Sequence, residues 1–115
     1  MTREFMDYID DIATEIDNIR IFTEGMTFDQ FAKDTKTAYA VVRSLEIIGE
    51  ATKSISDDIR AKYPEVPWRK MAGMRDKLAH DYISVDWEVV WSAVKLHVPE
   101  LHQFMLKIQQ DNSGN

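Results

Sequence analysis

The sequence predicts an all-α fold in which about four to five helices form one up-and-down bundle. Apolar residues recur at intervals of three and four along most of the chain, and no segment alternates strictly between polar and apolar residues. Glycine and proline are scarce, with 4 and 3 residues among 115. This length suits one hydrophobic core, so we expect a single helical domain over 1–110. A frayed tail is expected over 111–115, which has nothing apolar to bury.

The first two helices are predicted from an apolar stripe and from capping residues. The stripe runs through residues 4–23 and consists of Phe5, Ile9, Ile12, Ile16 and Ile19. Gly25 predicts the end of this helix. Thr27 then begins a short second helix, because Gln30 stands in the capping-box position and Met26 and Phe31 are spaced as a hydrophobic staple.

The third predicted helix, over 35–54, has an apolar stripe and an opposite polar stripe. The polar stripe consists of Lys36, Tyr39, Arg43, Glu46, Glu50 and Lys53. Two interpretations of it remain open. It is a solvated face with ion pairs between residues three and four apart, or Arg43, Glu46 and Glu50 support a site as the wall of a cleft or an interface.

Prolines divide the remainder of the chain. Ser56 predicts a brief capped turn, and Pro64 and Pro67 break the chain before a helix that starts at Pro67 or Trp68. A last helix is predicted from about residue 85, and Pro99 should bend it. Its apolar stripe is Trp87, Val90, Val94, Val98, Leu101, Met105 and Ile108.

Composition excludes several functional classes. The chain has no cysteine, which excludes disulfides and a thiolate nucleophile. The amino terminus is acidic and no apolar run approaches about 18 residues, so we expect a cytoplasmic protein without a membrane segment. The net charge of −6 disfavours loose binding to nucleic acid. Basic residues nevertheless gather at Arg69, Lys70 and Lys77, which we expect to contact RNA.

Residues 74–82, MRDKLAHDY, are the most informative segment for chemistry. The guanidinium of Arg75 matches the oxygens of a phosphodiester, and His80, with an ordinary pKa of about 6.5, can take or give a proton near neutral pH. Attack of a ribose 2′-hydroxyl on its own phosphate needs both functions and no metal. His97 and His102 stand apart from acids at ligand spacing, so we expect neither a metal nor another cofactor.

The spacing of these residues constrains how they could meet. Tyr82 returns to nearly the same helix face as Arg75, whereas His80 points about 140° away. Either the helix loosens near Ala79, so that His80 lies at its C-terminus, or a second subunit completes the site, and we favour both together. Taken alone, each residue also has an ordinary structural interpretation, with Arg75 as a surface charge, His80 as a helix-end histidine and Tyr82 as an anchor at the core edge.

Arg75, His80 and Tyr82 resemble the R-x-x-x-x-H-x-Y signature of the HEPN superfamily. The segments VVRSLEIIGEA, VPWRKMAGMRDKLAHDY and VDWEVVWSAVKLHVPEL are similar to the HepT branch of that superfamily, over roughly residues 38–106. The resemblance implies a helical bundle that forms a homodimer and brings two motif copies into one cleft. It also implies a toxin encoded beside a minimal nucleotidyltransferase antitoxin.

The resemblance further implies roles for individual residues. Arg75 would bind phosphate and stabilise charge, and His80 would act as general acid and base in RNA cleavage. Tyr82 would be a cleft residue and the acceptor of AMP transferred by the antitoxin, which adds bulk and negative charge beside Arg75. Asp76 departs from the branch, which often has Asn there. An acid at this position either orients the motif side chains or weakens phosphate binding.

Two hypotheses of function follow. The first is a toxin that acts as a metal-independent endoribonuclease. The second is a non-catalytic module that binds a nucleotide or docks a nucleotidyltransferase, with Tyr82 as the modified residue. The acidic net charge and the direction of His80 favour the second.

Overall fold

The computed structural model describes residues 4–81 and 86–113, with the side chains of residues 4–74 and 86–113. Every regular element in these ranges is a helix, so the predicted all-α class is confirmed. The long arms are α1 (Phe5–Thr23), α3 (Thr35–Lys53), α5 (Trp68–Asp81) and a continuous arm of α6 (Trp87–Ser92), η2 (Ala93–His97) and α7 (Val98–Asp111). The short helices are α2 (Phe28–Lys33) and α4 (Asp57–Lys62).

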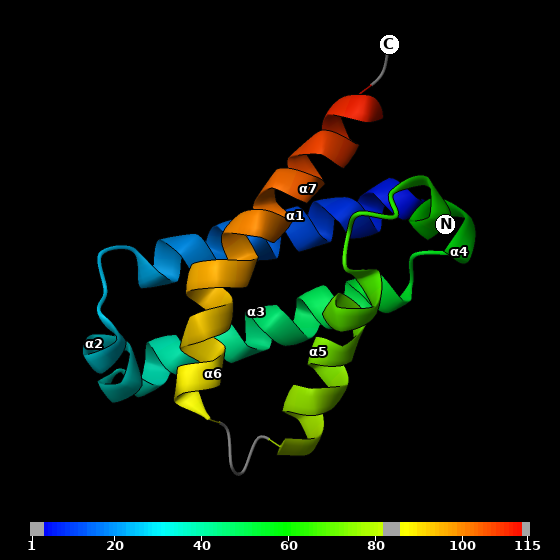
Figure 1. Ribbon diagram of the computed structural model, residues 1–115. Coiled ribbons are helices and arrows are strands. Elements are labelled where there is room, and N and C mark those ends of the chain that lie inside the picture. Colours follow the sequence, from blue (N-terminus) through cyan, green and yellow to red (C-terminus); the bar gives the residue numbers. More distant parts are fainter. Residues whose placement is uncertain (1–3, 82–85, 114–115) are drawn as a thin grey trace.

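The helices form a bundle built around α1 and α3 (Figure 1). These two run side by side in opposite directions, with α2 at the turn between them, while α5 packs on α3 and α7 packs on α1. α6 contacts α2. The described molecule measures 45 × 29 × 29 Å. None of the described helices combines the length and the apolar character that crossing a bilayer requires.

The stripe predicted for the first helix forms the centre of the core. Ile9, Ile12, Ile16 and Ile19 of α1 are all fully buried, as are Val41 and Ile48 of α3. Complete burial of an aliphatic side chain contributes about 1.5–3 kcal/mol relative to exposure. Apolar periodicity therefore explains why α1 and α3 pack against each other.

The predicted turn after α1 is confirmed in detail. Gly25 has a φ of 74°, a conformation that suits glycine at the end of a helix. Thr27 Oγ1 accepts a hydrogen bond from the Gln30 N–H at 3.2 Å, and Gln30 Oε1 accepts one from the Thr27 N–H at 2.9 Å. This capping box starts α2, whose Phe31 is fully buried.

The segment after α3 contains the short helix α4 and then the start of α5. Ser56 caps α4 as predicted, but α4 extends to Lys62 and is a helix instead of a brief turn. α5 begins at Trp68, directly after Pro67, which agrees with the prediction. The Trp68 indole donates to the Tyr63 carbonyl at 2.9 Å, and Met71 is 1% exposed. These contacts fix the first turn of α5 against the core.

The last arm differs from the single bent helix that the sequence predicts. It begins at Trp87, with Asp86 Oδ1 accepting from the Glu88 N–H at 2.9 Å, and its middle, η2, is π-helical. Pro99 follows directly in the first turn of α7. Proline lacks the N–H that would close an α-helical turn, and a wider π-turn before it accommodates that loss.

The end of α7 contacts the body of the bundle. Asp111 belongs to α7, one residue beyond the domain boundary predicted at 110. The Tyr63 hydroxyl donates to Asp111 Oδ2 at 3.3 Å and accepts from Asn112 Nδ2 at 3.2 Å. The first residues after the predicted boundary are therefore held by side-chain hydrogen bonds.

Candidate active site

The predicted catalytic segment lies on the second half of α5. Arg75 and His80 belong to this helix, as do Asp76 and Lys77, but their side chains lie outside the described part of the chain, and Tyr82 lies outside the described residues altogether. α5 is α-helical through Asp81. The predicted loosening near Ala79 is therefore not observed, and His80 lies in the last helical turn.

The first turn of α5 carries two of the basic residues that we expect to contact RNA. Arg69 and Lys70 are both exposed. They precede Arg75 along the same helix, so phosphate groups could approach cations along its length. Their contact with RNA stays a prediction.

The polar stripe on α3 is exposed in part and carries an ion pair. Arg43 Nη1 lies 3.7 Å from Glu50 Oε1, with the two side chains 61% and 46% exposed. The partners are two helical turns apart, not one as the solvated-face interpretation expects. Glu46, between them in the sequence, is half-buried. The helix that carries this stripe packs on α5, the helix that carries Arg75 and His80.

Tyr39 and Trp87 form a contact that sequence reasoning did not identify as functional. Tyr39 is 64% exposed, and its ring centroid lies 6.0 Å from that of Trp87 at an interplanar angle of 40°. Trp87 is the first residue of α6. The chain between Asp81 and Trp87 can span at most about 20 Å when fully extended, so the backbone of Trp87 lies within that distance of the end of α5. The feature of the sequence that could have indicated this contact is an aromatic residue, Tyr39, between Lys36 and Arg43 on one helix face.

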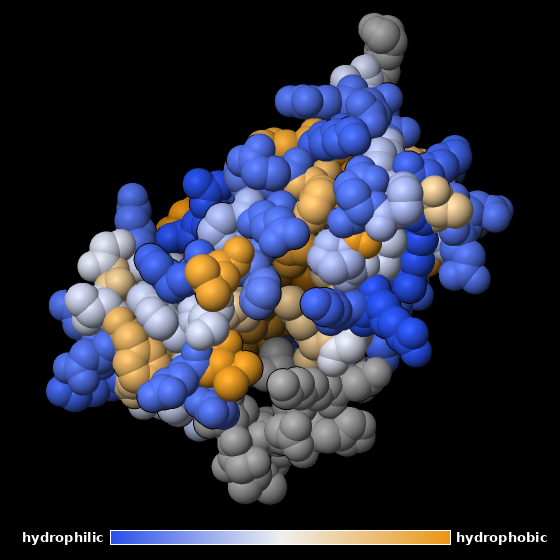
Figure 2. All heavy atoms as spheres, viewed as in Figure 1, coloured by the Kyte–Doolittle hydropathy of each residue, from blue (hydrophilic) through white to orange (hydrophobic). Residues whose placement is uncertain are grey.

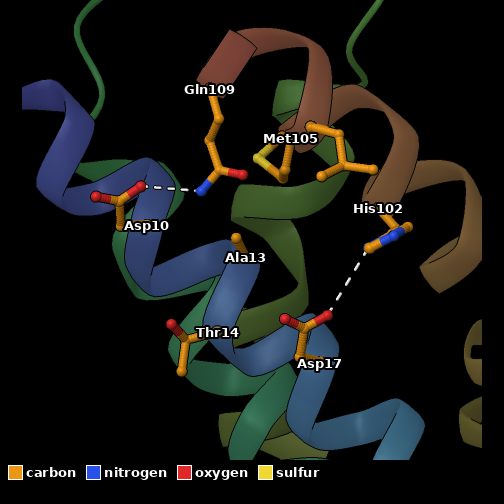
Figure 3. Close-up of a pocket in the computed structure, with 8 residues that line it drawn as sticks. Asp10, Ala13, Thr14, Asp17, His102, Met105 and Gln109 are labelled. Carbon is orange, nitrogen blue, oxygen red and sulfur yellow. Dashed lines mark hydrogen bonds and ion pairs between the residues drawn. The ribbon is translucent and has the colours of Figure 1, made fainter. Parts of the chain in front are cut away.

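A separate cavity of about 250 Å³ lies between α1 and α7 (Figure 3). Its lining residues are Asp10, Ala13, Thr14, Asp17, His102, Met105, Leu106 and Gln109. Gln109 Nε2 donates to Asp10 Oδ1 at 2.9 Å, and His102 Nδ1 lies 3.9 Å from Asp17 Oδ1. Arg20 Nη1 lies 3.0 Å from His102 Nε2. His102 of α7 therefore contacts two side chains of α1.

On the face that Figure 2 shows, hydrophilic side chains cover most of the surface outside the grey residues, and hydrophobic side chains show in small separate groups. Large hydrophobic residues that are exposed in the described part of the chain are Ile21, Phe22, Tyr39, Val89, Leu96 and Leu106. Tyr39 is the aromatic residue with the larger exposed fraction among them.

Comparisons with known proteins agree with the resemblance. A family model described as "Ribonuclease HepT-like" matches residues 12–108. A "Probable ribonuclease HepT" from Thermococcus cleftensis is 50% identical over 101 residues, which cover 88% of this chain and 92% of the relative. A "Putative RNase MJ1216" from Methanocaldococcus jannaschii is 44% identical over 112 residues, which cover 97% and 93%. No solved structure matches the chain significantly. The chain therefore belongs to the HepT-like ribonuclease family of the HEPN superfamily.

Proposed function

We propose that this protein is a metal-independent endoribonuclease that acts as the toxin of a toxin–antitoxin pair. The observation that carries the proposal is the order Arg75, His80, Tyr82 within the region that matches a ribonuclease family. Arg75 and His80 share one helix, and His80 lies in its last turn. The family relationship supports an RNA substrate, and the motif supplies the groups that cleave it.

The chemistry divides into charge stabilisation and proton transfer. The 2′-oxygen of a ribose attacks the adjacent phosphorus, a new O–P bond forms, and the bond from phosphorus to the 5′-oxygen breaks. Arg75 stabilises the negative charge that accumulates on the phosphate oxygens. His80 takes the 2′-hydroxyl proton or gives a proton to the leaving 5′-oxygen. A guanidinium carries permanent positive charge, so these steps need no metal.

A homodimer supports this chemistry. Attack and departure require one proton to be removed and one to be delivered, and each chain provides one motif histidine. Two copies related by a two-fold axis would place a second imidazole in a shared cleft. Arg69, Lys70 and Lys77 would contact the RNA backbone, and Arg43, Glu46 and Glu50 would support the cleft from α3.

The direct test of the proposed function is RNA cleavage in the presence of EDTA. We expect wild-type protein to cleave and His80→Ala to lose cleavage, with its melting temperature within a few degrees of wild type. His102→Ala is the matched control, because His102 bridges α1 and α7 and should be dispensable for cleavage. Full cleavage by His80→Ala would remove His80 from the mechanism.

Regulation by modification of Tyr82 is the second part of the proposal. A cognate minimal nucleotidyltransferase would transfer AMP from ATP to the Tyr82 hydroxyl, with release of pyrophosphate. The added phosphate would place negative charge beside the motif and repel RNA. After incubation with the partner and ATP, intact mass should increase by one or more AMP units for wild type and stay unchanged for Tyr82→Phe. An equal increase in both would place the modification elsewhere.

The net charge of −6 favours one alternative, a non-catalytic module that binds a nucleotide or docks the nucleotidyltransferase. This alternative predicts that the protein is modified at Tyr82 and that purified wild type leaves RNA intact. The cleavage assay therefore separates the two functions, whereas modification alone does not.

A further inference from the structure

An exposed aromatic side chain lies between two cations on the polar face of α3. Tyr39 is 64% exposed, and Lys36 and Arg43 are exposed residues placed one turn before and one turn after it. Residues spaced by three and four lie on the same face of a helix. The three side chains therefore form one continuous surface, which we call the α3 strip.

The Tyr39 ring is held from one side by other aromatic residues. It contacts Trp87, and Trp87 in turn makes an edge-to-face contact with the fully buried Phe31, with ring centroids 6.1 Å apart. This chain of rings connects an exposed side chain to the core. An aromatic ring that is ordered before binding loses less conformational entropy when a ligand stacks on it.

The charges of the α3 strip suit a phosphate backbone. The chain as a whole carries a net charge of −6, yet this part of α3 presents a lysine on one side of the Tyr39 ring and an arginine on the other. Arg43 pairs with Glu50 at 3.7 Å, with both side chains largely exposed. Exposed ion pairs of this kind contribute little to stability, so a phosphate can replace the carboxylate as the partner of Arg43.

The position of the α3 strip relates it to the motif. Tyr39 contacts the first residue of α6, and α6 follows the motif in the sequence. α5, which carries Arg75 and His80, packs on α3. Aromatic stacking combined with flanking cations is the pattern by which proteins bind single-stranded nucleic acid.

We propose that the α3 strip binds a single-stranded part of the RNA substrate, with one base stacked on Tyr39 and phosphates contacted by Lys36 and Arg43. The inference rests on the proposed ribonuclease function and adds a substrate-binding surface to it. The α3 strip would select unpaired RNA, because a base within a duplex has no free face to stack on Tyr39.

Binding can be measured separately from cleavage. In the His80→Ala background, the affinity for a mixed-sequence, single-stranded oligoribonucleotide is measured by fluorescence anisotropy. Tyr39→Leu should weaken binding about tenfold or more, since base stacking on an aromatic ring has an effect of this order. Tyr39→Trp should retain it. Phe22→Leu is the matched control, because Phe22 is a 40% exposed aromatic residue at the end of α1.

Salt dependence tests the role of the cations. Lys36→Gln should reduce the slope of log affinity against log salt concentration by about 0.7, the change expected for one lost phosphate contact with a single strand. An unchanged slope would remove Lys36 from the contact. This variant changes an exposed side chain, so it also tests the α3 strip if Tyr39→Leu fails to fold.

The outcomes separate this inference from the proposed function. Equal RNA affinity for Tyr39→Leu and the His80→Ala parent would overturn the α3 strip and leave the endoribonuclease proposal intact. If Tyr39→Leu instead converts a dimer to a monomer in analytical ultracentrifugation, and RNA affinity changes only with that conversion, the strip is a protein interface and the inference is wrong. A parent that binds no RNA would contradict both proposals.

Discussion

At the scale of single residues, Asp34 has a defined electrostatic role, because it ends α2 and begins α3. Asp34 Oδ1 accepts from the Thr37 N–H at 3.0 Å, and Oδ2 accepts from the Thr37 hydroxyl at 2.8 Å. These hydrogen bonds, with a smaller contribution from nearby Lys36, lower the pKa of the Asp34 carboxyl below its ordinary 3.8. The charged cap therefore stabilises the fold.

The sign of this effect predicts how stability depends on pH. A carboxyl whose pKa is lower in the folded state contributes stability that is present above pH 3.8 and is lost as the pH falls through the folded value. Asp34→Asn keeps a capping side chain but removes the charge. We expect wild type to melt at a higher temperature than Asp34→Asn at neutral pH, and this difference to shrink as the pH falls below 3.8. A difference that stays constant with pH would contradict the assignment.

The candidate site shows which residues sequence reasoning can find. Arg75 and His80 stand out because their side-chain chemistry and spacing are both visible in the sequence. The contact between Tyr39 and Trp87 is not visible there, since it joins residues of α3 and α6 that are far apart in the chain. It depends on how the helices pack, which spacing within one helix does not specify.

At the scale of elements, periodicity and capping predict most of the fold. The stripe of α1 and the capping box at Thr27 are both observed as predicted. The π-helical segment η2 was missed. Val90, Val94 and Val98 are spaced by four residues, which fits an α-helix and a π-helix equally well over so short a segment. Pro99 signalled a distortion without specifying its form.

Gly73 in α5 gives a prediction at this scale. It is exposed in the helix interior, and among the described atoms nothing lies within 4 Å of the position that an added Cβ would take. Gly73→Ala should therefore stabilise the protein by about 0.5–1 kcal/mol, because alanine loses less backbone entropy in a helix. Thermal unfolding should show a melting temperature higher by a few degrees.

The melting temperature of Gly73→Ala also tests whether the space around Gly73 is open. A lower melting temperature for Gly73→Ala would contradict open space at this position. If the variant is more stable but cleaves RNA more slowly, the backbone near Gly73 comes close to the substrate or to a second subunit. Activity and stability are therefore measured on the same preparation.

At the scale of the whole molecule, the motif and the cavity involve different helices. The motif helix α5 packs on α3, whereas the cavity lies between α1 and α7. Among the residues whose side chains the structure describes, none that lines this cavity belongs to α3 or α5. The helical framework is thus predictable from the sequence. The proposed joining of two motif copies in a dimer would depend on surface complementarity between chains, which a helical pattern does not encode.

The central claim is that the protein cleaves RNA by attack of a ribose 2′-hydroxyl, with charge stabilised by Arg75 and protons transferred by His80. The most direct measurement is to identify the ends of the products that wild type forms in excess EDTA. We predict a 2′,3′-cyclic phosphate and a 5′-hydroxyl, and no cleavage where a 2′-deoxynucleotide replaces the nucleotide before the cut. Products with a 5′-phosphate, or cleavage at the deoxynucleotide, would contradict the account.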